Sequence, residues 1–267
     1  MTGRLDGKVA VVVGGGQSAG ATIGNGRAAC ITFAREGATV LVADRVLESA
    51  ESTVKMIHDE GGTAAAIEVD VTATADVEGL AARVRSDYGR VDVLHNNVGI
   101  ISTGATDEID LDFWNRMFAI NLDGIWQVIK HLGPIMREQG SGSIINISSL
   151  ASFLAGPENV GYATSKAALN SMSRSFAKEY AKHHVRVNVI APGAVETPIG
   201  VDQLVERTGL SREKVMEMRD STVPLGKQGS AFDVAKAAVF LASDDAAWIT
   251  GIILPVDGGA TLSIIPT

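Results

Sequence analysis

A serine, a tyrosine and a lysine stand close together in the chain, at Ser149, Tyr162 and Lys166. Tyr162 and Lys166 are four residues apart, so on a helix they lie about one turn from each other on the same face. A lysine cation there favours the tyrosinate, which would let a phenol with an ordinary pKa near about 10 act as acid or base near neutral pH. The Ser149 hydroxyl could hold a substrate oxygen. An amphipathic surface pair is the alternative for Tyr162 and Lys166.

Asparagine and histidine side chains are the next candidates for chemistry. Asn121 lies in a segment with helical periodicity, and its amide could position a water molecule near Lys166 for proton relay. A hydrogen bond between helices is the alternative. The histidines, at positions 58, 95, 131, 183 and 184, lack the close grouping with cysteine or carboxylate residues that a zinc site usually shows. The sequence therefore predicts no metal.

A glycine-rich segment runs from Gly14 to Gly26, between an apolar run and a helical pattern. Glycine permits tight turns and lets backbone amides approach a pyrophosphate at a helix N-terminus without an intervening Cβ. A flexible surface loop is the alternative, but the flanking elements favour dinucleotide binding. We expect the contacts to come from Gly14, Gly24, Asn25 and Gly26, because the following helix must start near Arg27.

Asp44 ends the second apolar run. A carboxylate at this position can accept hydrogen bonds from both hydroxyls of an adenosine ribose and would repel a 2′-phosphate. The sequence therefore predicts NAD in preference to NADP, although the neighbouring Arg45 could soften that preference. A helix cap is the alternative role for Asp44.

Two further groups of residues follow the third and fourth apolar runs. Asp70 and Val71 come where an adenine ring would lie, and Asn97, Val98 and Gly99 follow the fourth run. Ligands of doubly wound sheets bind outside the carboxyl ends of the strands. We therefore expect all of these residues at one cleft.

The elements that must position these side chains alternate along the chain. Short runs that are apolar at consecutive positions predict strands covered on both faces, at Val9–Val13, Thr39–Val42, Ala66–Val69, Val91–Leu94, Ser143–Ile147, Val185–Ile190 and Ile252–Val256. Helical patterns occupy Arg27–Glu36, Glu48–Glu60, Val77–Tyr88, Phe113–Met136, Tyr162–Lys182 and Ala231–Ala242. This βαβ series predicts an α/β fold, a doubly wound (Rossmann), mostly parallel seven-stranded sheet with helices on both faces.

The whole chain, residues 1–267, reads as a single dinucleotide-binding domain, because no linker or low-complexity tract divides it. The segment 198–224 interrupts the alternation of strands and helices, since it is polar and charged and has helical stretches but no strand. A substrate lid is the functional interpretation of this segment, and a solvated surface helix is the alternative.

Composition limits the compartment and the partners. The formal net charge of -8 makes nucleic acid and anionic membranes unlikely partners. The N-terminal residues lack an apolar signal core, and no stretch reaches the roughly 18 apolar residues of a membrane span. Cys30 is the sole cysteine, so no intramolecular disulfide can form. The sequence predicts a cytoplasmic protein.

Together these residues resemble the short-chain dehydrogenase/reductase family over essentially the full chain. Asn96-Asn97-Val98-Gly99 is similar to that family's Asn-Asn-Ala-Gly, and Tyr162 to Lys166 is similar to its Tyr-x-x-x-Lys, with Ser149 at the family's spacing. The chain departs in the glycine-rich turn, where Gly14 to Gly26 spans twelve residues and the family's turn spans six. Six residues are therefore inserted, in a loop that either reaches over the cofactor or bulges into solvent.

The resemblance implies further roles. Asn121 would complete a catalytic tetrad with Ser149, Tyr162 and Lys166, and Lys166 would also hold the nicotinamide ribose. The stretch similar to the family's Pro-Gly-x-x-x-Thr would border the nicotinamide through Pro192, Gly193, Val195 and Thr197. The fold also implies a homo-oligomer, a tetramer in many relatives.

The expected activity is hydride transfer between NAD and a small secondary alcohol or ketone, with Tyr162 as general acid and base. Phe153 and Leu154, with Ile100 and Ile101, could form an apolar substrate pocket, and core packing is their alternative role. An NADP-dependent carbonyl or 3-oxoacyl reductase is a second hypothesis. A non-catalytic NAD-sensing regulatory protein is a third, and the intact Ser149, Tyr162 and Lys166 argue against it.

Overall fold

β-Branched and small apolar residues build a parallel sheet at the centre of the molecule. The structure, a computed structural model, describes residues 3–101, 106–154 and 159–262. The strands of the sheet are β1 (Val9–Val13), β2 (Thr39–Asp44), β3 (Thr63–Glu68), β4 (Val93–Asn96), β5 (Gly142–Ile147), β6 (Val185–Pro192) and β9 (Ile253–Val256). Their spatial order is β3-β2-β1-β4-β5-β6-β9, and every neighbouring pair is parallel. The predicted doubly wound fold with seven strands is confirmed.

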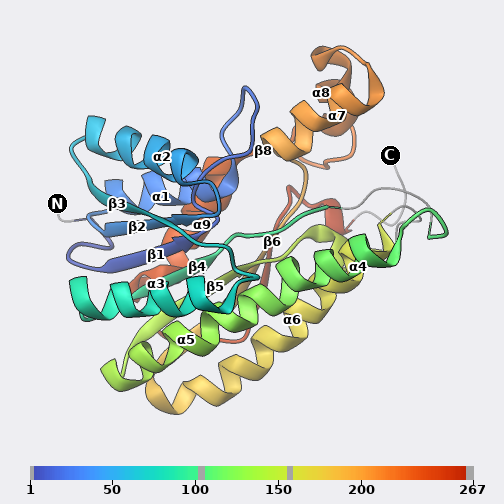
Figure 1. Cartoon of the computed structure of the whole chain (residues 1–267). Helices are drawn as coiled ribbons and strands as arrows, with labels where there is room; N and C mark the ends of the chain where they lie inside the picture. The colour runs from blue at the N-terminus through green and yellow to red at the C-terminus, as the bar shows by residue number, and fades with distance from the viewer. Residues whose placement is uncertain (1–2, 102–105, 155–158, 263–267) are drawn as a thin grey trace.

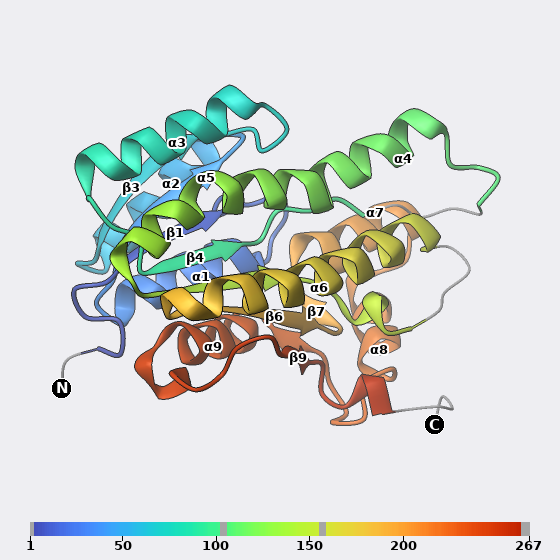
Figure 2. The same ribbon diagram turned by 90° about the horizontal axis from the view of Figure 1, so that it is seen from below.

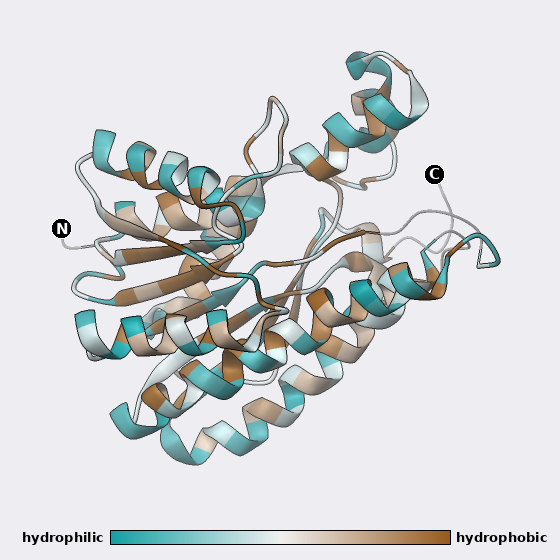
Figure 3. Cartoon of the chain, viewed as in Figure 1, coloured by the Kyte–Doolittle hydropathy of each residue, from teal (hydrophilic) through white to brown (hydrophobic). Residues whose placement is uncertain are grey.

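Helices cover both faces of this sheet (Figure 2). One layer holds α1 (Asn25–Arg35), α2 (Leu47–Asp59) and α9 (Ala231–Ala242), and the other holds α3 (Thr74–Asp87), α5 (Gly124–Gln139) and α6 (Val160–Tyr180). Successive side chains of a strand point to opposite faces, so Val11 and Val13 pack in the core of the second layer while Ala10 and Val12 pack in that of the first. Figure 3 shows the same division, with apolar residues concentrated on the sheet and on the inner sides of the helices.

The order of the strands reverses direction at one place, between β1 and β4. From β1 the chain moves outward to β2 and β3, and it then returns to β4 and continues through β5, β6 and β9 on the other side. Ligands of open α/β sheets bind at such a switch point, outside the carboxyl ends of the strands. The two strands remain hydrogen-bonded at this point, since Asn97 N–H donates to the Val13 carbonyl at 2.8 Å.

Many predicted boundaries differ from the structure by one to three residues, and two of the differences are informative. β3 starts at Thr63, three residues before the predicted Ala66, because pairing with β2 extends the strand through a run of alanines that have weak strand propensity of their own. The predicted helix Phe113–Met136 is α4 (Leu111–Phe118) and α5, joined by a π-helical segment, η1 (Ala119–Asp123). Single π turns inside helices are frequent at functional sites.

The segment 198–224 projects from the sheet layers beside the strand ends (Figure 1). It contains η4 (Pro198–Asp202), α7 (Gln203–Thr208) and α8 (Arg212–Asp220), and no strand. A short parallel pair that the sequence pattern did not indicate, β7 (Val195–Glu196) with β8 (Gly229–Ser230), closes its base. Two-residue strands are too short to show a periodicity.

Candidate active site

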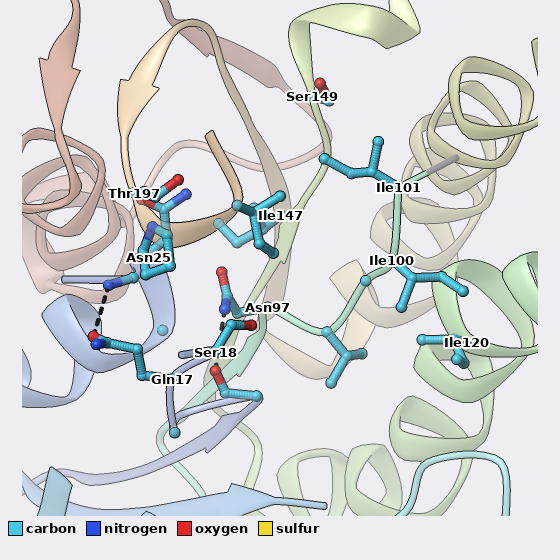
Figure 4. Close-up of a pocket in the computed structure, with 18 of the residues that line it drawn as sticks. Gln17, Ser18, Asn25, Asn97, Ile100, Ile101, Ile120, Ile147, Ser149 and Thr197 are labelled. Carbon is cyan, nitrogen blue, oxygen red and sulfur yellow. Dashed lines mark hydrogen bonds between the residues drawn. The ribbon is translucent and has the colours of Figure 1, made fainter. Parts of the chain in front are cut away.

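A cavity of about 790 Å³ lies at the carboxyl ends of the strands. Its walls come from the turn after β1, the ends of β2, β4, β5 and β6, the start of α6 and the segment 198–224. Figure 4 shows Gln17, Asn25 and Thr197 on one side and Ile100, Ile101 and Ile120 on the other. The volume falls in the range of small-molecule and cofactor sites.

The glycine-rich turn brings two backbone segments into close approach. Gly14 has a φ of +79°, in the region that favours glycine, and its N–H donates to the Ala43 carbonyl at 2.8 Å. A Cβ on Gly26 would overlap the Gly14 carbonyl oxygen. The side-chain amide of Asn97 donates to the same oxygen at 3.1 Å. Only glycine fits at position 26. Because Gly26 has no side chain, the first turn of α1 can pack directly against the backbone of Gly14.

The first turn of α1 is suited to hold a diphosphate. Its N-cap is Gly24, which has no side chain to cap the N–H groups that follow it, although the Gln17 side chain accepts from the N–H of Gly24 itself. The Oδ1 atom of Asn25 is buried without a hydrogen-bond partner among the described residues. Free backbone donors and the positive end of the helix dipole are the groups that an anion needs, whereas the Asn25 oxygen can accept from a hydroxyl group or a water molecule. These residues fit the diphosphate of a dinucleotide, which Gly24, Asn25 and Gly26 would hold.

Asp44 faces the cavity from the end of β2. One carboxylate oxygen accepts from Gly16 N–H at 2.9 Å, and the other accepts from Val46 N–H at 3.1 Å. Each oxygen has a further lone pair for a ribose hydroxyl. The Val46 contact also resembles the capping role that the sequence left open, since Val46 is the N-cap residue of α2.

Ser149, Tyr162 and Lys166 line the opposite end of the cavity. Ser149 follows β5, and the other two stand on the first turns of α6, whose N-terminal end lies against this strand end. The Lys166 ammonium lies 5.9 Å from the centre of the Tyr162 ring and donates to the Ile147 carbonyl at 3.0 Å. The structure thus brings the three predicted catalytic side chains together.

Burial dominates the electrostatics of this group. Lys166 is 3% exposed, and burial lowers its pKa from 10.5 to about 8. Burial raises the pKa of Tyr162, and a hydrogen bond with Ser149 partly offsets this rise. The spacing of the two residues predicted that the lysine would favour the tyrosinate, whereas in the structure the desolvation of Tyr162 has the larger effect on its pKa. Tyr162 therefore keeps its proton near neutral pH in this environment.

Asn121 lies in the π-helical segment η1 and is fully buried. Its Oδ1 accepts from Ile100 N–H at 2.8 Å, and its Nδ2 donates to the Ile100 carbonyl at 2.9 Å and to the Ser165 hydroxyl at 3.1 Å. Asn121 thus joins the chain after β4 to α6, next to Lys166. These three bonds use both hydrogens of the amide group and one lone pair of its oxygen. The predicted contact between the Asn121 amide and a water molecule stays a prediction.

The predicted cofactor residues converge on the one cavity. Its described lining includes all of them: Gly14, Gly24, Asn25, Gly26, Asp44, Arg45, Asp70, Val71, Asn97, Val98, Gly99, Tyr162, Lys166, Pro192, Gly193, Val195 and Thr197. Their individual roles stay predictions. Among the described residues, no group of three or more histidine, cysteine or carboxylate side chains could hold a metal ion.

The predicted substrate residues are divided. Phe153 and Leu154 are 47% and 43% exposed and do not belong to the described lining of the cavity, so their role stays a prediction. Ile100 and Ile101 do line it, together with Ile120. Sequence reasoning missed Ile120 and Arg219, because a core helix residue and a basic residue in a surface helix carry no pattern that points to a site.

Comparisons with known proteins agree with this geometry. The family model described as Enoyl-(Acyl carrier protein) reductase matches residues 20–261. A 2,5-dichloro-2,5-cyclohexadiene-1,4-diol dehydrogenase of Sphingobium indicum is 39% identical over 99% of this chain and 100% of its own length. A 3-oxoacyl-[acyl-carrier-protein] reductase of Thermotoga maritima is 35% identical over 97% of this chain and all of its own.

Solved structures show the same relationship. A Burkholderia xenovorans protein assigned to the short-chain dehydrogenases/reductases superposes with a TM-score of 0.89 at 39% identity, covering 98% of this chain and 100% of that one. A gluconate 5-dehydrogenase of Burkholderia cenocepacia, in complex with NADP and tartrate, gives a TM-score of 0.87 at 30% identity over 98% of both chains. Sequence, fold and site agree, and the chain belongs to the short-chain dehydrogenase/reductase family of oxidoreductases.

Proposed function

We propose that the protein is an NAD-dependent oxidoreductase that transfers a hydride between the nicotinamide and a secondary alcohol or ketone. The observation that carries the proposal is that Ser149, Tyr162 and Lys166 line the same cavity as the glycine-rich turn and Asp44. Proton-transfer groups and a dinucleotide cradle are therefore within reach of one bound substrate. The apolar wall of Ile100, Ile101 and Ile120 suits a substrate with an apolar part.

The side chains divide the proton chemistry among them. A bound nicotinamide would supply the acceptor or donor of the hydride that leaves or joins the substrate carbon. During oxidation the substrate hydroxyl passes its proton to Tyr162 in its deprotonated form, and during reduction the Tyr162 hydroxyl gives its proton to the carbonyl oxygen. Ser149 holds that same oxygen, and the Lys166 ammonium stabilises negative charge on the tyrosine.

Replacing Tyr162 tests this mechanism. Tyr162→Phe removes the phenolic oxygen and leaves the ring, so we expect kcat to fall about 100-fold or more while NADH still binds. Tyr88→Phe is the matched control, because Tyr88 packs against the core away from the cavity. Turnover of alcohols and ketones is followed as NADH absorbance, and binding as NADH fluorescence. A Tyr162→Phe enzyme as active as wild type would overturn the mechanism.

Asp44 supports the preference for NAD. Its half-buried carboxylate faces the cavity and would repel a 2′-phosphate. We expect Asp44→Ala to narrow the ratio of kcat/KM between NAD and NADP. Asp6→Ala, at an exposed position outside the described lining of the cavity, is the control. An unchanged ratio would remove Asp44 from this role.

An NADP-dependent carbonyl or 3-oxoacyl reductase is the second candidate. It is favoured by the neighbouring Arg45, which lines the cavity, and by the gluconate 5-dehydrogenase whose structure contains NADP. A higher kcat/KM with NADPH than with NADH would establish it. Binding of NADH with no turnover across a panel of alcohols, ketones and 3-oxoacyl thioesters would instead favour a regulatory protein.

We also infer that the whole chain works as one domain, in the cytoplasm, and as a homo-oligomer. Large apolar side chains are exposed on this one protomer, among them Trp126 on α5, Trp248, and Leu262 near the C-terminus, at 45%, 101% and 82% exposure. Burial between copies would remove them from water. Light scattering coupled to gel filtration measures the assembly, and a monomer would contradict this inference. No helix in the described residues is long and apolar enough to cross a membrane.

A further inference from the structure

The longest departure from the family pattern, the loop between β1 and α1, makes contact with the segment 198–224. The loop rises beside η4 and α7 in Figure 1. Gly16, Gln17 and Ser18 from the loop and Pro198 and Gly200 from the segment line the same cavity. The two therefore form adjoining parts of the wall of the proposed dinucleotide site.

Asp202 joins these two parts with both of its carboxylate oxygens. Oδ2 accepts from the loop, from Ala21 N–H at 2.9 Å and from the Thr22 hydroxyl at 3.2 Å. Oδ1 accepts from Arg212 at 2.6 Å, and the same guanidinium donates to Glu196 at 2.7 Å. The Asp202 side chain is only 15% exposed. Water therefore weakens its ion pair with Arg212 less than it weakens a fully exposed pair.

The loop is shaped for this contact. Gly20 has a φ of +153°, and a Cβ there would overlap Asp202 Oδ2 and lie 2.8 Å from the Cβ atom of Pro198. At its base the loop is held independently, because Gln17 N–H donates to the Ser49 hydroxyl at 2.6 Å and the Gln17 side chain accepts from Gly24 N–H at 3.0 Å. Only the tip depends on Asp202.

We propose that Asp202 is a positioning residue that latches the inserted loop to the segment 198–224, so that both close over the dinucleotide together and set its rate of release. This inference rests on the proposed function, since it requires a dinucleotide in the cavity. The latch needs a carboxylate. An asparagine has an oxygen at only one of the two positions that accept, so its NH₂ group would face a donor either on the loop or on Arg212.

The test measures the dissociation of NADH from the full protein by stopped-flow fluorescence, with NADPH as the second probe. We expect Asp202→Asn to raise the dissociation rate about 10- to 150-fold, the usual scale for losing one hydrogen bond to a charged group. Single-turnover hydride transfer should stay within about twofold of wild type, because Asp202 does not belong to the described lining of the cavity. A purely structural residue would lower thermal stability and leave the dissociation rate unchanged.

Variants on the loop side give an independent arm. Thr22→Val removes only the hydroxyl contact and should raise the rate about threefold, and this increase should vanish in an Asp202→Asn background if both act through one contact. Gly20→Ala introduces the overlapping Cβ and carries the same test if Asp202→Asn does not fold. Glu217→Gln is the matched control, because it breaks an exposed ion pair with Lys214 on α8 that touches no loop residue.

The outcomes separate the two proposals. Unchanged dissociation of NADH or NADPH in Asp202→Asn and Gly20→Ala would refute the latch and leave the proposed function standing. Equal increases of the dissociation rate in Asp202→Asn and Glu217→Gln would also refute the latch, since the effect would then not depend on the contact between Asp202 and the loop. Failure of the wild type to bind either dinucleotide would overturn the proposed function and the latch with it.

Discussion

Lys166→Met tests whether burial of the Lys166 cation lowers the stability of the folded protein. The substitution removes the charge and keeps a side chain of similar length. Lys166 is 3% exposed, and burial lowers its pKa from 10.5 to about 8. At about 1.36 kcal/mol per pKa unit, this difference means that burial of the cation costs the folded state about 3 kcal/mol at neutral pH.

The pH dependence follows from the sign of the shift. Between pH 8 and 10.5 the unfolded chain binds the proton that the folded protein has lost, so this lysine makes stability rise with pH. Below pH 8 both states are protonated and the full cost is present. Wild-type stability relative to Lys166→Met should therefore rise by about 2 kcal/mol from pH 7 to pH 9.5. At pH 7 the variant should be more stable by about 1 kcal/mol, once about 2 kcal/mol is subtracted for the lost hydrogen bond from the charged ammonium to the Ile147 carbonyl.

Urea unfolding at fixed protein concentration, from pH 7 to pH 9.5, measures the difference between the two proteins. Groups that titrate equally in both cancel from that difference. Lys178→Met, at an exposed position on the same helix, reports the effect of simply removing one positive charge from α6. A difference between wild type and Lys166→Met that does not change with pH would refute the reasoning.

Three further predictions concern single contacts. Ser149→Ala should raise the pKa of Tyr162 further, because it removes the hydrogen bond that lowers this pKa. Ultraviolet difference titration measures the pKa in wild type and variant, and an equal or lower pKa in the variant would contradict the prediction. Gly26→Ala should abolish NADH binding and lower stability, since its Cβ would overlap the carbonyl of Gly14, and retained binding in fluorescence titration would contradict this. Ser230→Ala breaks the capping box of α9 and should cost about 1 kcal/mol in urea unfolding with NADH affinity unchanged.

The sheet and its layers could be predicted from the sequence because their signal is strong and repeated. A strand such as Val9–Val13 is buried along its whole length, and an unbroken apolar run is what that burial requires. The edge strand β3 was predicted less well. Its alanines have little strand propensity, and pairing with β2, a tertiary effect, decides where it starts.

The site residues at strand ends could be predicted for a topological reason. In a parallel sheet all carboxyl ends meet at one edge, so Asp44, Asn97 and Ser149 had to lie near one another once the strands were recognised. The contacts made by Asp202 could not be predicted in this way. The loop that contains Ala21 and the segment that contains Asp202 lie about 180 residues apart, and no periodicity relates two irregular segments.

Burial decides between the two interpretations of the tyrosine and lysine pair. As a solvated surface pair, Lys166 would be exposed and would keep an ordinary pKa; it is instead buried, and no salt bridge joins it to a carboxylate among the described residues. A lone buried cation destabilises a fold, and a methionine of similar size would avoid the cost. Packing therefore does not explain a lysine at this position. A group that must carry positive charge near the ring of Tyr162 does explain it, because perturbed, poorly compensated charges are typical of functional sites.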